Sequence, residues 1–134
     1  AHTECTGRVG VVGFCFGGAI SYLQAASGLG FAGVIGFYGW PLGLKRWPDR
    51  PKPIDAVDRY TCPVLSIFGG ADEGIPKADV DQFEAACKRA GVRHDSTVYP
   101  GAPHSFFDRT SGEYQQECDD AWRRILAFVE SHAT

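Results

Sequence analysis

Cys15 is the residue of this chain whose surroundings most clearly favour chemistry. It stands in "GFCFGG", residues 13–18, where an apolar run meets several glycines and a helix-compatible stretch follows. This spacing is that of a nucleophile elbow, G-x-nucleophile-x-G, in which a sharp strand-to-helix turn lifts a side chain clear of a sheet. We predict a nucleophilic thiol at Cys15 and an oxyanion-binding backbone N–H at Phe16, with the small residues Gly13 and Gly17 permitting the turn.

Two other interpretations of this segment remain open. One is a purely structural Cys15, because unpaired cysteines often pack as small apolar side chains. The other is a glycine-rich phosphate loop with an incidental cysteine. The usual signatures of such loops, G-x-x-x-x-G-K-[ST] and G-x-G-x-x-G, do not occur in this segment, which favours the nucleophile.

A carboxylate and an imidazole follow two later apolar runs. Asp72 comes three residues after Gly69, and His104 stands in "YPGAPHSFFD". Each has an ordinary alternative, since aspartates cap turns and loop histidines are often surface residues; Glu73 competes with Asp72 for the acidic role. The chain order nucleophile, acid, base is that of α/β-hydrolases, and it predicts a Cys15–His104–Asp72 triad.

The elements that must position these side chains follow from hydrophobic periodicity. Short apolar runs predict strands at residues 8–14, 31–39, 63–69 and 94–100. Helices are predicted at residues 17–26, 76–90 and 113–132, with a proline-rich loop at residues 40–63. Alternating strands and helices indicate an α/β fold, with a mainly parallel sheet between two helical layers. The carboxyl ends of parallel strands share one edge, where the three side chains would meet.

The same periodicity predicts which helical side chains are buried. In the last helix the predicted core stripe is Cys118, Trp122, Ile125, Leu126 and Val129. In the middle helix Val80, Phe83, Cys87 and Ala90 recur at helical spacing, and in the first helix Ile20, Leu23 and Ala26 share a face. These side chains are expected to be core rather than part of a cofactor site.

Composition narrows the class of protein. The chain has 134 residues, 44% apolar and 22% charged, which suits one packed domain. A net charge of -3 argues against a non-specific nucleic-acid binder, and no apolar run approaches membrane-spanning length. The five cysteines have irregular spacing without a CxxC pair, so we expect a reduced, cytoplasmic protein in which Cys5, Cys62, Cys87 and Cys118 are mostly small core residues.

Three segments together resemble the dienelactone hydrolase (carboxymethylenebutenolidase) family of α/β-hydrolases: "GFCFGG", "CPVLSIFGGADEGIP" and "VYPGAPHSFFDR". The resemblance implies that Cys15 is the nucleophile, His104 the base and Asp72 its orienting carboxylate. A complete member of that family carries further strands before the elbow strand, together with a second oxyanion donor. Residues 1–134 are therefore expected to form a single α/β-hydrolase-like domain, the C-terminal portion of the full fold without its first strands.

By this resemblance the chain would hydrolyse small esters or dienelactone-like lactones through a thioester, without a metal or organic cofactor. Arg109 falls near a family arginine that binds the substrate carboxylate, although a solvated loop cation is an equal alternative. Phe14 and Tyr38 complete the predicted substrate-binding residues. An uncovered elbow strand predicts a homo-oligomer. The main alternative is a catalytically weak or silent remnant that acts as an oligomerising binding module; a thiol redox sensor is a third possibility.

Overall fold

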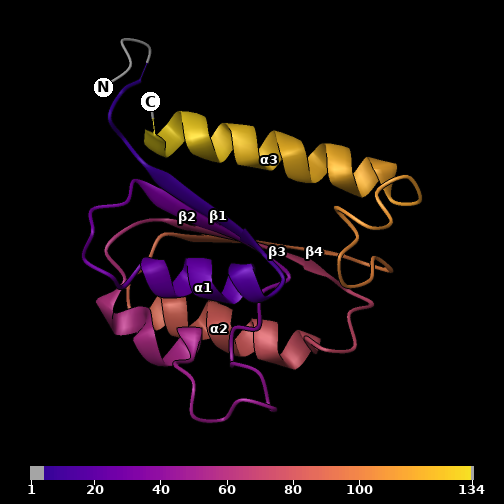
Figure 1. Cartoon of the computed structure of the whole chain (residues 1–134), viewed down its shortest axis with the longest axis horizontal. Coiled ribbons are helices and arrows are strands. Elements are labelled where there is room, and N and C mark those ends of the chain that lie inside the picture. The colour runs from indigo at the N-terminus through magenta and orange to yellow at the C-terminus, as the bar shows by residue number, and fades with distance from the viewer. Residues whose placement is uncertain (1–4, 134) are drawn as a thin grey trace.

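The computed structural model describes residues 5–133 and contains a four-stranded parallel sheet in the order β1-β2-β3-β4 (Figure 1). Its strands are β1 Gly10–Phe14, β2 Gly33–Phe37, β3 Val64–Gly69 and β4 His94–Tyr99. Its helices are α1 Phe16–Gln24, α2 Lys77–Arg89 and α3 Gln115–Ala133, with a 3-10 helix, η1, at Pro53–Arg59. The predicted strands and helices are all present, and the α/β fold class is confirmed.

Handedness explains the three layers. Each strand lies beside its predecessor, so right-handed crossovers carry α1, η1 and α2 across the same face of the sheet. After β4 the chain turns back, and α3 covers the opposite face, as Figure 1 shows. The strand register aligns Phe14 with Phe37 and Gly69 with Tyr99, which brings the carboxyl ends of all four strands to one edge.

Two glycines in β2 let helices approach the sheet closely. A Cβ on Gly36 would lie 2.3 Å from Cε1 of Tyr22 on α1, and one on Gly33 would lie 2.6 Å from Cε1 of Phe128 on α3. Residues 33 and 36 lie on opposite faces because side chains alternate along a strand. The fully buried ring of Tyr22 also donates a 3.0 Å hydrogen bond from its hydroxyl to the Gly36 carbonyl.

The predicted core stripe of α3 is wrong in part. Cys118 and Ile125 are buried, but Trp122 is 53% exposed, and Leu126 and Val129 are also exposed. The face of α3 that meets the sheet consists of Cys118, Ala121, Ile125 and Phe128. Among the described residues the sheet ends at β1. The stripe of α3 that contains Trp122, Leu126 and Val129 extends past that edge and is therefore not covered.

A continuous apolar surface results at this edge of the molecule. Val12 and Phe14 are exposed on β1 beside the exposed α3 residues Trp122, Leu126 and Val129. A groove of about 420 Å³ runs between the strand and the helix. We call these five residues the β1–α3 apolar surface.

Two further elements depart from the sequence expectation. Ile20 is exposed, because α1 packs on the sheet through Tyr22 and Ala25 instead of the predicted face. The predicted loop at residues 40–63 contains η1, which begins at the buried Pro53, a residue suited to the first helical position. The prediction for α2 is confirmed at Val80, Phe83 and Cys87, which are buried, whereas Ala90 follows the helix and is only partly buried.

A search of residues 5–133 for a helix long and apolar enough to span a membrane finds none.

Replacing Gly36 with alanine should destabilise the protein. The added Cβ would overlap the buried Tyr22 ring, and overpacking of this kind costs about 1–3 kcal/mol. We expect a lower Tm and a lower urea midpoint. Gly112→Ala is the matched control, because no atom lies within 4 Å of its added Cβ. Equal stabilities of the two variants would contradict this account of α1 packing.

Candidate active site

Cys15 occupies the sharp turn between β1 and α1. Its φ is 57° and its ψ is −121°, a left-handed backbone that non-glycine residues rarely adopt. Its N–H donates a 3.0 Å hydrogen bond to the Phe37 carbonyl at the end of β2. The structure therefore fixes this strained residue by a contact with the neighbouring strand.

Close backbone approaches explain the glycines around Cys15. A Cβ on Gly13 would lie 2.0 Å from the Gly17 carbonyl oxygen, as a tight elbow requires. The expectation for Gly17 is wrong, because its own Cβ would meet nothing within 4 Å. The crowded position is Gly18, whose Cβ would lie 2.5 Å from the Phe37 oxygen.

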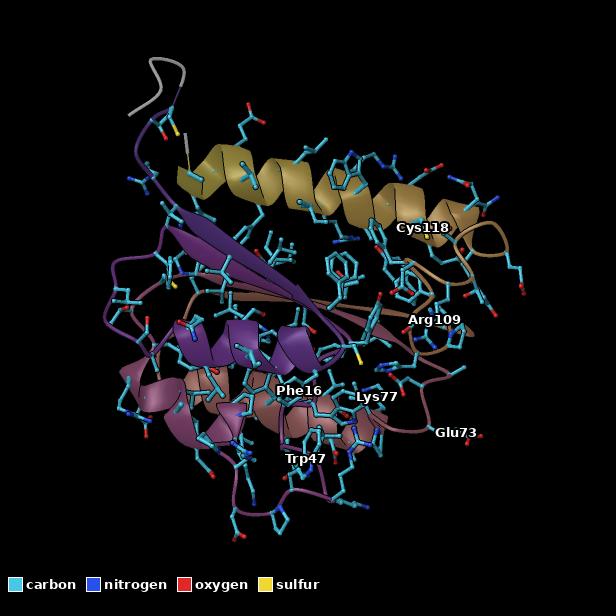
Figure 2. The ribbon with its side chains drawn as sticks, in the orientation of Figure 1. Phe16, Trp47, Glu73, Lys77, Arg109 and Cys118 are labelled. Carbon is cyan, nitrogen blue, oxygen red and sulfur yellow. The ribbon has the colours of Figure 1, made fainter. Side chains whose placement is uncertain are left out.

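Cys15, His104 and Asp72 form a continuous row of contacts. Cys15 Sγ lies 3.1 Å from His104 Nε2, and His104 Nδ1 lies 2.6 Å from Asp72 Oδ2. The second carboxylate oxygen of Asp72 accepts a 2.9 Å hydrogen bond from the Gly74 N–H. Each partner comes from a different loop at the carboxyl edge of the sheet. Glu73, the competing acid, is exposed and points away from the body of the molecule (Figure 2).

The buried carboxylate controls the charge of the imidazole. The side chain of Asp72 is 3% exposed and that of His104 is 28% exposed. The hydrogen bond to Asp72 raises the pKa of His104 from 6.5 to about 9, and the contact with Cys15 adds to this rise, while burial opposes it. His104 is therefore protonated at neutral pH, with a donor N–H on each ring nitrogen.

Two aromatic rings flank the imidazole. The Tyr38 ring centroid lies 5.0 Å from that of His104, and the Trp40 centroid lies 4.9 Å away. Tyr38, predicted to bind substrate, is fully buried, and burial raises the pKa of its phenol. Its hydroxyl has no hydrogen-bond partner. Because the side chain is buried, it packs beside the imidazole instead of lining a cavity. The sequence analysis did not predict a role for Trp40. Its position directly after a predicted strand was the only feature of the sequence that indicated a place near the site.

The sulfur and the imidazole open onto a cavity of about 590 Å³. Its charged lining residues are Lys45, Arg46, Glu73 and Asp79, and the indole of Trp40 supplies an apolar wall. The cavity therefore combines an apolar wall with charges of both signs around the Cys15 thiol.

The other predicted site residues surround this region at different depths. Phe16 is the first residue of α1, so its N–H has no partner within the helix; its ring contacts Trp47 at 5.3 Å (Figure 2). Phe14 is 39% exposed and stacks on Phe37 at 4.7 Å. Arg109 is exposed on the loop between β4 and α3 and is not a lining residue of the cavity that contains Cys15.

The remaining cysteines have no comparable environment. Cys62, Cys87 and Cys118 are buried as expected, and burial raises the pKa of each thiol. Cys5 is exposed, which corrects the core assignment for that residue. Among residues 5–133 no group of three or more His, Cys, Asp or Glu side chains could hold a metal ion.

A second histidine–hydroxyl pair lies away from this edge. His94 begins β4, and its Nε2 lies 2.8 Å from Oγ of Ser66. Ser66 is fully buried, and burial lowers the pKa of His94. The pair satisfies buried polar groups and offers no accessible nucleophile.

Comparison with known proteins shows the family of this chain. A model of the dienelactone hydrolase family matches residues 1–133. A Methylorubrum extorquens protein named as a candidate carboxymethylenebutenolidase is 37% identical over 128 residues, covering 95% of this chain and 44% of that protein. A crystal structure of a candidate dienelactone hydrolase from Klebsiella pneumoniae has a TM-score of 0.81 at 29% identity, covering 92% of this chain and 52% of that one. A Pyrococcus furiosus esterase, 17% identical with a TM-score of 0.75, shares the fold; the match covers 95% of this chain and 54% of that one. The chain spans about half the length of these relatives.

Asp72→Asn should remove a pH-dependent part of the stability. Because the folded-state pKa of His104 is raised from 6.5 to about 9, the Asp72 contact stabilises the fold fully below about pH 6.5, and this contribution disappears as the pH rises through about 9. The shift sets an upper bound of about 3 kcal/mol, which solvent access to the ring reduces. We expect the difference in unfolding free energy between wild type and variant to shrink over that range, as urea denaturation at several pH values would measure.

Asp81→Asn is the charge-matched control for this experiment. Asp81 forms an exposed ion pair with Lys77 on α2, and such pairs contribute little to stability. Its effect should be small across the same pH range. A pH-independent difference for Asp72→Asn would contradict the assignment of the His104 charge to Asp72.

Proposed function

This chain belongs to the dienelactone hydrolase family, and we propose that it hydrolyses small carboxylic esters or lactones through Cys15, His104 and Asp72. One observation carries the proposal: a sulfur, an imidazole and a buried carboxylate stand in contact at the mouth of a cavity. A nucleophile, a base and an orienting group in this geometry constitute the machinery of acyl transfer.

Acylation would begin at the sulfur. Cys15 Sγ lies 3.1 Å from the Nε2 of the protonated imidazole, and the thiolate is the nucleophilic form of cysteine. The thiolate attacks the ester or lactone carbonyl, and a C–S bond forms. As the tetrahedral intermediate collapses, the C–O bond breaks and His104 donates its Nε2 proton to the departing oxygen. The products of this step are a thioester on Cys15 and an alcohol or enol.

Deacylation would use the same imidazole as a base. The neutral ring accepts a proton from water, whose oxygen attacks the thioester carbonyl. The C–S bond breaks, the acid leaves, and the thiolate–imidazolium pair returns. Throughout, Asp72 would hold Nδ1–H and keep the ring in a single orientation.

The developing oxyanion would bind at the start of α1. The Phe16 N–H and the positive end of the helix dipole lie directly after Cys15. A second donor would be expected to contribute roughly 3–4 kcal/mol to transition-state stabilisation. By resemblance to the family, this second donor comes from the segment before the elbow strand, so we propose slow turnover for residues 1–134 by themselves.

The proposed substrates are small and activated. Thiolates act on esters and lactones more readily than on amides, which favours lactones of the dienelactone kind. Phe14 precedes Cys15 in the chain, but it lines the groove between β1 and α3 and not the cavity that contains Cys15, so it offers no contact within that cavity. Arg109 is proposed as an anion-binding residue that would have to turn toward the bound substrate, because it is exposed outside the lining of the cavity.

Hydrolysis of p-nitrophenyl acetate tests the proposal. We expect slow release of p-nitrophenol, reduced about a hundredfold or more in Cys15→Ala. Acid quenching followed by peptide mapping should find an acetyl group on the Cys15 peptide. The exposed Cys5 is an internal control for non-specific acetylation. Equal rates for the two proteins, or acetyl groups on Cys5 and Cys15 alike, would favour the catalytically silent binding module.

We also propose that the chain self-associates through the β1–α3 apolar surface. Five large apolar side chains are exposed there, beside a strand edge that is unpaired among the described residues. Such an edge promotes association with another chain. A cytoplasmic location remains our proposal as well, supported by five free cysteines.

Light scattering over a range of concentrations tests this association. We expect a mass above the 14.5 kDa of one chain, and a shift toward the monomer in Trp122→Lys. Leu29→Lys is the matched control, since Leu29 is 71% exposed but does not line the groove. A monomer at every concentration would refute the proposed interface.

A further inference from the structure

Trp40 connects the two ends of the histidine–aspartate pair. Its Nε1–H donates a 2.9 Å hydrogen bond to the Gly74 carbonyl, and the Gly74 N–H donates one to Asp72 Oδ1. Asp72 Oδ2 contacts His104, whose ring lies 4.9 Å from the Trp40 ring at an interplanar angle of 33°. The contacts therefore form a closed cycle of four residues: Trp40, Gly74, Asp72 and His104.

We propose that Trp40 is a positioning residue that holds the Asp72 turn through its N–H and holds the His104 imidazole toward Cys15 through its ring. This inference rests on the proposed function for its catalytic meaning, but the contacts it describes can be tested without any substrate.

A second aromatic ring also packs beside the imidazole. Tyr38 is fully buried, its ring lies 5.0 Å from His104 and 5.8 Å from Phe106, and its hydroxyl bonds to nothing. Complete burial therefore holds the Tyr38 ring in place. Trp40 is only partly buried, and it packs beside the imidazole where the cavity begins. Without the indole, the ring could tilt away from Sγ into the cavity.

The indole also suits the charge of the ring it covers. A cation within about 6 Å of an aromatic centroid is attracted to the ring face, and tryptophan gives the strongest such interaction. His104 has a raised pKa, due first to Asp72 and then to Cys15, and is protonated at neutral pH. Trp40 and Tyr38 would stabilise that cation further.

Other charged groups lie near the imidazole, and a test must separate them from Trp40. Cys15 contacts it from the elbow, Asp72 from the loop after β3, and Tyr38 from the end of β2. Lys45, Arg46, Glu73 and Asp79 line the same cavity. Substitutions at Trp40 retain all of these groups, so a change in the titration of His104 comes either from the loss of the indole ring or from a shift of the Asp72 turn that its N–H holds.

Fluorescence provides the direct test, because protonated imidazole quenches the emission of an adjacent indole. The chain has three tryptophans, so replacing Trp47 and Trp122 with phenylalanine leaves Trp40 as the only emitter. We expect its emission to rise with a midpoint near pH 9, where His104 loses its proton. The added substitution His104→Asn should abolish the rise. If the emission stays constant through this range while NMR shows that His104 titrates, the proposed contact between the Trp40 and His104 rings is overturned.

Paired variants test the positioning role. Trp40→Leu removes both contacts and should lower the pKa of His104, followed by NMR, by about half a unit. Trp40→Phe keeps a ring without the N–H and should restore most of that shift. Trp122→Leu, on α3, is the matched control and should leave the titration unchanged. A His104 pKa that is the same in Trp40→Leu and wild type would refute the inference.

Kinetics connects the contact to turnover. In Trp40→Leu we expect kcat for p-nitrophenyl acetate to fall about tenfold while KM stays within about twofold, because the indole orients the imidazole and contributes little to substrate binding. An unchanged kcat would contradict the positioning role. If wild type itself shows no hydrolysis, the proposed function fails, whereas the fluorescence and NMR titrations still decide whether Trp40 holds the ring.

Discussion

The candidate site depends on the close backbone contact between the end of β2 and the start of α1. Cys15 N–H bonds to the Phe37 carbonyl, and the missing side chains of Gly18 and Gly39 allow that approach; a Cβ on Gly39 would lie 2.4 Å from the Ala19 nitrogen. This contact holds Cys15 in its left-handed conformation, which would otherwise cost about 1–3 kcal/mol without compensation. It also brings the residues after β2 next to the thiol.

Four different segments of the chain contact the imidazole. Cys15 and Asp72 contact its two nitrogens, and the rings of Tyr38 and Trp40 pack beside it. The buried carboxylate sets its charge, which the aromatic faces suit. Positioning and electrostatics therefore have the same origin, the convergence of four loops at the carboxyl edge of one parallel sheet.

The sheet is covered unevenly, and this asymmetry affects both stability and assembly. β2 and β3 are buried on both faces, whereas β1 leaves an apolar strand and one stripe of α3 exposed. The chain spans about half the length of its relatives, and it contains the complete row of contacts from Cys15 to Asp72. The reactive geometry and the exposed edge thus lie on the same small scaffold.

The sequence by itself determined the elbow, the order of strands and helices, the parallel sheet and the buried face of α2, because glycine spacing and hydrophobic periodicity are local properties. It also indicated which loops would supply a thiol, a carboxylate and an imidazole. Only the tertiary structure decided between Asp72 and Glu73 and showed that Trp40 packs beside His104. It also showed that Tyr38 is buried and Trp122 exposed, and that the glycine in close contact with β2 is Gly18 and not Gly17. These outcomes depend on contacts between residues distant in sequence and on where the sheet ends, and periodicity along one segment carries no information about either.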